Sequence, residues 1–260
     1  MKNWDFLDGK VDGYAGLILM KSREKILVII PAYNEEESVK KVILEVRHYL
    51  AEADILLVND GSTDLTSERA RSSGVLVLDL PFNLGIGGAV QAGYKYAYEK
   101  GYSIAIQVDG DGQHDPKEIP KLVEVLKKKK VDMVIGSRFL VHTEYRSSIM
   151  RRLGISIFSN LISAIGGQKI TDPTSGFRAA NHKAIQLFAS NYPQDYPEPE
   201  AVILLHRSRL KMEEVPVGMS ERYAGESSIT RMRSAYYMVK VLLAILVDCF
   251  KKRPSLRTGG

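Results

Sequence analysis

The amino-acid sequence predicts an α/β fold with a mainly parallel central sheet and helices on both of its faces. From Lys25 onward, short apolar runs of strand length alternate with stretches that carry apolar residues at helical spacing. The strand-length runs are apolar throughout, which is typical of strands that are covered on both faces. With 260 residues, 45% of them hydrophobic, the chain is long enough for one large domain with a substantial core.

The first predicted strand, residues 26–30, is a mostly β-branched run, and a helix over residues 35–50 follows it. In that helix, Val39, Val42 and Val46 recur on one face. The same alternation then repeats along the chain. The further predicted elements are a strand at 55–58, a helix near 63–72, a strand at 75–80, a helix near 88–100, a strand at 104–108, a helix at 116–129 and a strand at 133–135.

The second half of the chain is less regular. It predicts a helical stretch over 148–165, a loop at 171–176, a helix over 201–210, a short strand at 213–217 and a last helix over 236–250. The last helix carries apolar residues on one face, and Lys251, Lys252 and Arg253 follow it. We therefore divide the chain into an N-terminal extension (1–24), a main domain (25–232) and a C-terminal amphipathic helix with a basic tail (233–260).

Composition and charge narrow the classes of partner. The net charge of +5 suits a phosphate-bearing ligand or an anionic membrane surface, whereas the scattered basic residues and the absence of zinc-finger spacing predict no nucleic-acid partner. The single cysteine, Cys249, excludes an intramolecular disulfide and favours a reducing, cytoplasmic setting. We expect no signal peptide and, because no run of 18 apolar residues occurs, no membrane-spanning helix.

Polar segments follow five of the predicted strands. In a parallel sheet, ligands bind outside the carboxyl ends of the strands, so these segments are expected to converge on one edge. They are residues 31–35, 59–62, 83–88, 109–116 and 136–138.

The segment after the fourth strand predicts a divalent-cation site. Asp109 and Asp111 are separated by one glycine and followed by another, which lets the backbone turn tightly. Magnesium and manganese prefer oxygen ligands and keep positions open for phosphate oxygens, so two carboxylates and the Gln113 carbonyl would form a partial shell. The alternative is an acidic turn that caps the helix beginning at Pro116. The position directly after a core strand favours the cation site. His114 is a candidate either for a supporting role or for direct metal contact.

Two further segments are candidates for nucleotide contacts. Asp60 lies in a polar stretch able to hydrogen-bond a nucleobase, although the same stretch could simply cap the next helix. Asn83 and Gly88 lie in a glycine-rich stretch whose spacing does not match a dinucleotide-binding fingerprint, so a nicotinamide cofactor is not expected. Glycines at a helix start nevertheless allow close approach of a phosphate or ribose.

Six short motifs follow one another along residues 25–232. They are Pro31-Ala32-Tyr33-Asn34-Glu35-Glu36, Asn59-Asp60-Gly61-Ser62-Thr63-Asp64, Asp109-Gly110-Asp111-Gly112-Gln113-His114-Asp115-Pro116, Gly136-Ser137-Arg138-Phe139, Asp172-Pro173-Thr174-Ser175-Gly176-Phe177-Arg178 and Arg222-Tyr223-Ala224-Gly225-Glu226-Ser227-Ser228. In this order they resemble the motifs of family 2 glycosyltransferases, in the branch of dolichyl-phosphate mannose synthases and bacterial polyprenyl-phosphate glycosyltransferases.

This resemblance implies a GT-A fold and an inverting, Mg²⁺- or Mn²⁺-dependent transfer from a UDP- or GDP-sugar to a polyprenyl phosphate at the cytoplasmic membrane face. It implies that Asp109, Asp111 and Gln113 bind the metal. It implies donor contacts from Pro31, Ala32, Tyr33, Glu35, Asp60, Asp109, Gly110, Asp111, Arg222 and Ser227. The glycine-rich stretch adds Asn83 and Gly88 to the predicted donor contacts. It further implies acceptor contacts from Arg138, Ser175 and one of Arg151 or Arg152, for which we choose Arg152, and catalytic roles for Asp111, Arg138 and Glu200.

The need for a catalytic base stays open. A hydroxyl acceptor requires a carboxylate to take its proton, and Glu198 and Glu200 lie where the family places an acidic residue before a helix. A phosphate acceptor is already ionised at neutral pH. The alternative for both glutamates is a favourable position at a helix N-terminus.

Three alternative functions are also compatible with an α/β nucleotide-binding fold. Transfer to a hydroxyl of a glycan or lipid-linked saccharide uses the same donor site. A sugar-phosphate nucleotidyltransferase would need a Gly-rich basic loop where the chain has Pro31 to Glu35, and a non-catalytic nucleotide-sugar binder would not need both Asp109 and Asp111. The helix over 236–250 predicts a peripheral contact with the membrane, with a small membrane protein or with a second copy, or else packing on its own domain.

Overall fold

The computed structural model describes residues 24–140, 159–160, 162–163, 168–220 and 240. The extension at residues 1–23, most of the predicted helix over 148–165 and nearly all of the predicted C-terminal helix lie outside the described residues. The division at 24, 232 and 233 therefore stays a prediction.

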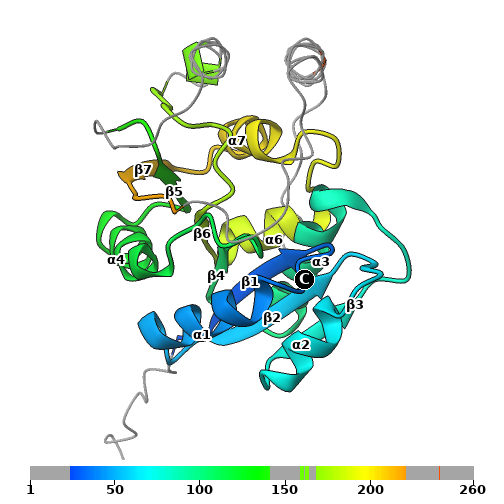
Figure 1. Cartoon of the computed structure of the whole chain (residues 1–260). Helices are drawn as coiled ribbons and strands as arrows, with labels where there is room; N and C mark the ends of the chain where they lie inside the picture. Colours follow the sequence, from blue (N-terminus) through cyan, green and yellow to red (C-terminus); the bar gives the residue numbers. More distant parts are fainter. Residues whose placement is uncertain (1–23, 141–158, 161, 164–167, 221–239, 241–260) are drawn as a thin grey trace, which may run out of the picture.

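A seven-stranded sheet forms the centre of the molecule, in the order β3-β2-β1-β4-β6-β5-β7 (Figure 1). Every neighbouring pair of strands is parallel except the two pairs that involve β6. The prediction of a mainly parallel sheet is confirmed. The strands are β1 Ile26–Ala32, β2 Asp54–Asn59, β3 Leu76–Asp79, β4 Ile104–Gln107, β5 Met133–Ser137, β6 Arg178–Asn181 and β7 Met212–Pro216.

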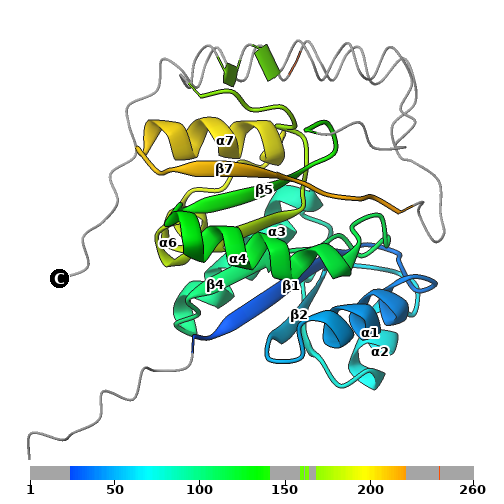
Figure 2. The same ribbon diagram turned by 90° about the vertical axis from the view of Figure 1, so that its left-hand side faces the viewer.

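Helices cover both faces of the sheet, as the apolar strands predict. Alternate residues of β1 point to opposite faces: Leu27 and Ile29 pack in a core with α3, α6 and α7, and Val28 packs in a second core with α1, α2 and α4. Figure 2 views the sheet from the side of α1 and α4. The helices are α1 Val39–Tyr49, α2 Thr66–Ser72, α3 Gly85–Glu99, the 3₁₀ turn η1 Pro116–Glu118, α4 Ile119–Lys129, α6 His182–Ser190 and α7 Pro197–Arg207.

Two elements differ from the prediction, because the sequence pattern did not indicate β6 or α6. β6 has only four residues, with two alanines between Arg178 and Asn181, so it lacks the β-branched run that marks the other strands. Asn181 also ends the strand by capping α6, since its side-chain oxygen accepts hydrogen bonds from the N–H groups of Lys183 and Ala184.

The antiparallel direction of β6 has a consequence for the site. Arg178, its first residue, pairs in register with Gln107 at the end of β4 and with Ile135 in β5. The loop before β6 therefore lies at the same edge as the carboxyl ends of the parallel strands, and the segment 171–177 joins the five polar segments there.

Smaller differences concern element boundaries and burial. β3, predicted as a buried strand, is one of the two edge strands of the described sheet, and Leu76 and Asp79 at its ends are exposed. Helix α3 begins at Gly85, three residues before the predicted start, and packs so closely on the sheet that a Cβ on Gly93 would lie 2.4 Å from Ile29 Cγ2. Among the residues that the structure describes, no helix is long and apolar enough to cross a membrane.

Candidate active site

The loops after β1 and β2 are bound to each other at the sheet edge. The Asn34 N–H donates to the Ser62 hydroxyl (3.0 Å), and the Thr63 N–H donates to Asn34 Oδ1 (2.9 Å). The Glu35 N–H donates to Thr66 Oγ1 (2.8 Å). The predicted donor residues Pro31 to Glu35 are therefore held beside the Asp60 loop, with Tyr33 exposed at its side.

Asp60 connects the second loop to the third. Its carboxylate is buried and accepts a hydrogen bond from the Leu84 N–H (2.7 Å). Burial raises the pKa of Asp60, and the N–H groups of Leu84 and Gly85 partly oppose that rise. The approach is tight enough to need glycine at position 61, where φ is +72° and a Cβ would lie 2.8 Å from the Asn83 nitrogen. Asp60 and Asn83 are thus brought together, as their assignment to the donor requires.

Gly88 has a packing role in the structure. A Cβ on the preceding residue, Gly87, would lie 2.6 Å from the Pro193 carbonyl oxygen, and one on Gly88 would lie 2.5 Å from Leu84 Cβ. Both glycines are buried under the protein's own chain at the start of α3. Donor contact at Gly88 stays a prediction, and close chain packing is a second reason for a glycine there.

The loop after β4 is pressed against the end of β1. A Cβ on Gly110 would lie 3.2 Å from the Pro31 carbonyl oxygen, and the Ser38 hydroxyl donates to the Gly110 carbonyl (2.7 Å). Asp111 is buried, and its Oδ1 accepts from the Gln113 N–H (2.9 Å). Asp109 is partly exposed. The two carboxylates therefore follow one another around a single tight turn at the sheet edge.

His114 contacts Asp109 through both of its ring nitrogens. Its Nδ1 accepts from the Asp109 N–H (3.0 Å), so the neutral ring carries its proton on Nε2, which lies 3.5 Å from Asp109 Oδ2. The ring stacks on Phe177, with centroids 4.9 Å apart. Burial lowers the pKa of His114 to about 4, so the imidazole is neutral at pH 7. Both nitrogens face Asp109, which supports a positioning role over direct metal contact.

This lowered pKa predicts a pH-dependent stability of the metal-free protein. Between about pH 6.5 and about pH 4 the unfolded chain takes up a proton on His114 that the folded protein excludes, so the free energy of unfolding falls as the pH falls. Above pH 6.5 His114 is neutral in both the folded and the unfolded chain, so it no longer contributes to the change of the free energy of unfolding with pH. In urea unfolding with a chelator present, His114→Asn should lose less stability than the parent chain between pH 6.5 and 4.5. Identical slopes would contradict the buried neutral imidazole.

Gln113 connects the cation loop to the segment after β7. Its main-chain carbonyl accepts from the Ser220 N–H (3.0 Å), and His114 forms an isolated antiparallel bridge with Met219. Met219 and Ser220 thus lie beside His114 and Gln113 of the cation loop. Arg222 itself and Ser227 lie outside the described residues, so their assignment to the donor stays a prediction.

The oxygen donors of this loop fit a divalent cation that a ligand completes. Within the described parts of the chain, no group of three or more His, Cys, Asp or Glu side chains forms a full protein shell. Asp109, Asp111 and Gln113 offer oxygens only, and a partial oxygen shell is how Mg²⁺ is commonly held together with substrate phosphates. The residues present fit Mg²⁺ or Mn²⁺.

Arg138 forms a buried ion pair with Asp172. Its Nε and Nη2 donate to the two carboxylate oxygens at 2.6 and 2.7 Å, and Nη2 also donates to the Thr174 hydroxyl (2.9 Å). The two side chains are 7% and 0% exposed. Asp172 occupies the Nε and Nη2 side of the guanidinium. An acceptor phosphate would therefore have to approach Arg138 from another side. Of the other acceptor residues, Ser175 is buried in the same loop and Arg152 lies outside the described residues.

Arg178 ties this loop to the start of α7. The side chain is fully buried, and it donates to the carbonyls of Ser175 (2.7 Å), Pro173 (3.1 Å) and Glu198 (2.8 Å). Burial raises the pKa of the Glu198 carboxyl and the Arg178 charge opposes the rise, while Asp109 raises the pKa further. Glu198 is thus electrostatically coupled to the cation loop. Glu200, our choice of catalytic residue, lies in the same first turn, and its role stays a prediction.

Three charged residues at this edge had no role assigned from the sequence: Asp172 and Arg178, which are buried, and Glu214, which is half-buried. The first two belong to a motif that was recognised as a whole. Glu214 could have been noticed as a charged residue inside a short strand.

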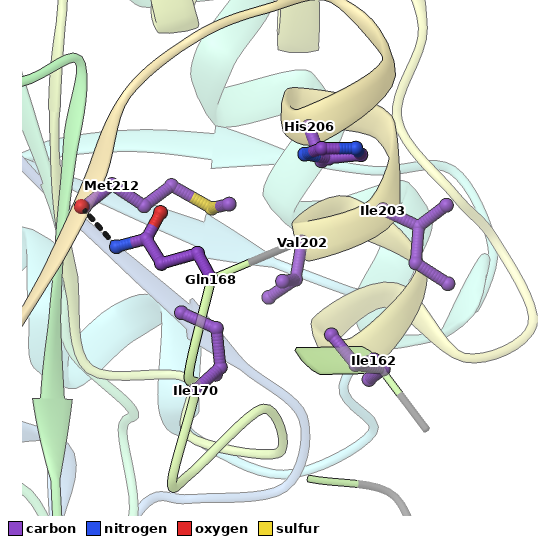
Figure 3. Close-up of a pocket in the computed structure, with 7 residues that line it drawn as sticks. All are labelled: Ile162, Gln168, Ile170, Val202, Ile203, His206 and Met212. Atoms are coloured by element: carbon purple, nitrogen blue, oxygen red, sulfur yellow. Dashed lines mark hydrogen bonds between the residues drawn. The ribbon is translucent and has the colours of Figure 1, made fainter. Parts of the chain in front are cut away.

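None of the predicted site residues lines the small pocket of Figure 3, which lies among Ile162, Gln168, Ile170, Val202, Ile203, His206 and Met212.

Comparison with known proteins supports the resemblance. Residues 27–188 match the family described as Glycosyl transferase family 2. An undecaprenyl-phosphate mannosyltransferase of Micrococcus luteus is 33% identical over 215 residues, which cover 79% of this chain and 88% of that protein. A UDP-N-acetylglucosamine–dolichyl-phosphate N-acetylglucosaminyltransferase of Methanococcus voltae is 30% identical, over 74% of this chain and 84% of its own length.

A solved structure confirms the fold. Glucosyl-3-phosphoglycerate synthase from Mycobacterium tuberculosis, crystallised with Mn²⁺, UDP and phosphoglyceric acid, superposes with a TM-score of 0.70 at 20% identity, over 89% of this chain and 81% of its own. The arrangement of sheet, helices and strand-end loops is thus that of the GT-A fold. The chain belongs to glycosyl transferase family 2 and is a family 2 glycosyltransferase.

Proposed function

We propose that this glycosyltransferase moves a sugar, with inversion, from a UDP- or GDP-sugar to a polyprenyl phosphate at the cytoplasmic face of the membrane, and that it needs Mg²⁺ or Mn²⁺. The observation that carries the proposal is the position of Asp109 and Asp111 in one tight turn after β4, at the edge of the sheet where the Asp60 loop and the Arg138–Asp172 pair also lie. The names of the relatives, which act on undecaprenyl and dolichyl phosphates, support the choice of acceptor.

On the donor side, Asp109, Asp111 and Gln113 would hold the cation. When bound, the cation neutralises the negative charge that develops on the leaving diphosphate. His114 fixes the orientation of Asp109 through both ring nitrogens. Tyr33 and Asp60 would contact the base and ribose, since the loops that carry them meet next to the cation loop.

On the acceptor side, a phosphate oxygen would attack the anomeric carbon from the face opposite the diphosphate. The new bond joins that oxygen to the anomeric carbon, and the bond from the anomeric carbon to the nucleoside diphosphate breaks with its electron pair. A phosphate is ionised at neutral pH, so no base has to remove a proton. Arg138 and Arg152 would offset the charge of the acceptor, with Ser175 in the same loop region.

A second candidate function is favoured by Glu198. Transfer to a hydroxyl of a glycan or lipid-linked saccharide requires a general base, and a half-buried carboxyl with a raised pKa is suited to that task. The family assignment sets aside the nucleotidyltransferase reading. The proposal includes a peripheral location, with a membrane protein or a second copy bound through residues 236–250.

A donor panel tests the proposal. The purified chain is incubated with UDP-glucose, UDP-N-acetylglucosamine or GDP-mannose, with Mg²⁺ or Mn²⁺, and with undecaprenyl phosphate or a saccharide that offers only hydroxyls. We expect one donor to label the lipid phosphate and chelation to stop the reaction. Transfer to the saccharide alone would favour the second candidate.

A further inference from the structure

Glu214, in the middle of β7, receives three hydrogen bonds from the loop before β6. Its carboxylate accepts from the N–H groups of Thr171 (2.7 Å) and Asp172 (2.8 Å) and from the Thr171 hydroxyl (3.0 Å). No motif in the sequence includes it. A half-buried carboxylate that binds two consecutive main-chain N–H groups fixes the path of the chain at that point.

The residues that Glu214 holds are those that bind Arg138. Asp172, whose N–H bonds to Glu214, clasps the Arg138 guanidinium through both carboxylate oxygens and also accepts from the Arg138 N–H (3.1 Å). The Thr171 hydroxyl lies 2.7 Å from the Ser137 hydroxyl. The Glu214 carboxylate thus binds the loop at Thr171 and Asp172, and the same loop contacts Ser137 and Arg138 at the end of β5.

Strand register explains why this position is suited to the task. β7 runs parallel to β5, and Glu214 is in register with Ile135, three residues before Arg138. The strand that delivers Arg138 and the strand that carries Glu214 are therefore hydrogen-bonded neighbours. The loop is held against both of them, so Asp172 meets the guanidinium in one orientation.

We propose that Glu214 is a positioning residue for the acceptor site, because it fixes Asp172 and thereby sets the orientation of Arg138. The inference rests on the proposed function, in which Arg138 faces the acceptor phosphate. Glu214 does not touch the substrates, so its removal should affect acceptor binding without changing the donor side. A merely structural role would lower stability without a selective effect on the acceptor.

Glu214→Gln is the informative variant. It preserves the size of the side chain but replaces one accepting oxygen with an NH₂ group, which cannot accept from either N–H of the loop. We expect the KM for polyprenyl phosphate to rise about tenfold, the scale of one lost charge-assisted hydrogen bond, and the KM for the nucleotide sugar to stay within about twofold. Glu213→Gln is the matched control, since Glu213 is partly exposed and pairs with Lys129 on the surface.

A second readout is independent of the acceptor. The Arg138 Nε–H should give a slowly exchanging NMR signal, because it donates to Asp172 and is buried; Arg138→Lys assigns that signal. We expect faster exchange in Glu214→Gln and no change in Glu213→Gln. Thr171→Val, which removes only the hydroxyl contacts, should shift both readouts in the same direction by less, and it serves if Glu214→Gln does not fold.

The outcomes separate the two claims. A parent chain that transfers no sugar to polyprenyl phosphate contradicts the proposed function, while the exchange rate of Arg138 still reports on positioning. An unchanged exchange rate in the Glu214 and Thr171 variants, or equal rises of both KM values, would overturn the role of Glu214.

Discussion

Replacing Asp111 by asparagine should lower kcat for sugar transfer by at least about a hundredfold, which is the usual effect of losing one group that stabilises transition-state charge. The side chain is buried, and its Oδ1 accepts from the Gln113 N–H, a bond that the asparagine oxygen can still accept. The turn should therefore keep its shape while the loop loses one of its two negative charges. Cation binding weakens, and the leaving diphosphate loses its compensating charge.

Asp54→Asn provides the control for this variant. Asp54 lies at the first position of β2, at the edge of the sheet opposite the site, and accepts from the Tyr102 hydroxyl (2.8 Å). Its asparagine can accept the same bond, so activity should stay within about twofold, as for surface changes away from special features. Initial rates at increasing Mn²⁺ concentration compare the two variants. An Asp111→Asn enzyme with parental kcat and unchanged Mn²⁺ dependence would contradict the assignment of the metal.

Replacing Asp172 by asparagine should lower the free energy of unfolding by about 3–5 kcal/mol, because it leaves the buried Arg138 guanidinium without its counter-charge. The rate of sugar transfer to the acceptor should also fall, since Asp172 sets the orientation of Arg138. Urea unfolding of the variant measures the first effect. The double variant Arg138→Gln, Asp172→Asn should regain part of the stability without regaining transfer, because no buried charge is then left unpaired.

An exposed ion pair supplies the comparison for the Asp172 variant. Arg71 and Asp79 pair on the surface with side chains 56% and 41% exposed. Asp79→Asn should change the free energy of unfolding by no more than about 1 kcal/mol. If the free energy of unfolding falls by the same small amount in the Asp172 and Asp79 variants, the Arg138–Asp172 pair does not stabilise the fold as a buried ion pair.

The sequence was sufficient to predict the parallel part of the sheet, because most of its strands are continuous apolar runs that alternate with amphipathic helices. It also placed the polar strand ends at one edge, which follows from parallel direction alone. It failed at β6, where two alanines carry no strand signal and the direction of the strand is reversed. The reversed strand is what adds Asp172 and Ser175 to the site.

The supporting contacts could not have been predicted in the same way. Arg138 and Asp172 are 34 residues apart, and Glu214 reaches Asp172 across 42 residues. No periodicity links such residues, because their meeting depends on the strand order β6-β5-β7. The role of His114 likewise follows from which nitrogen faces the Asp109 N–H, and only the folded loop determines that.

The bond made in the product is the most direct test of the proposed reaction. The chain is incubated with its donor, Mn²⁺ and polyprenyl phosphate, and the lipid product is analysed by mass spectrometry before and after mild acid. A sugar on a phosphate oxygen should add one glycosyl unit to the lipid phosphate, be released by mild acid, and be absent when the cation is chelated. An acid-stable product with the sugar on a hydroxyl, or release of free sugar alone, would contradict transfer to a polyprenyl phosphate.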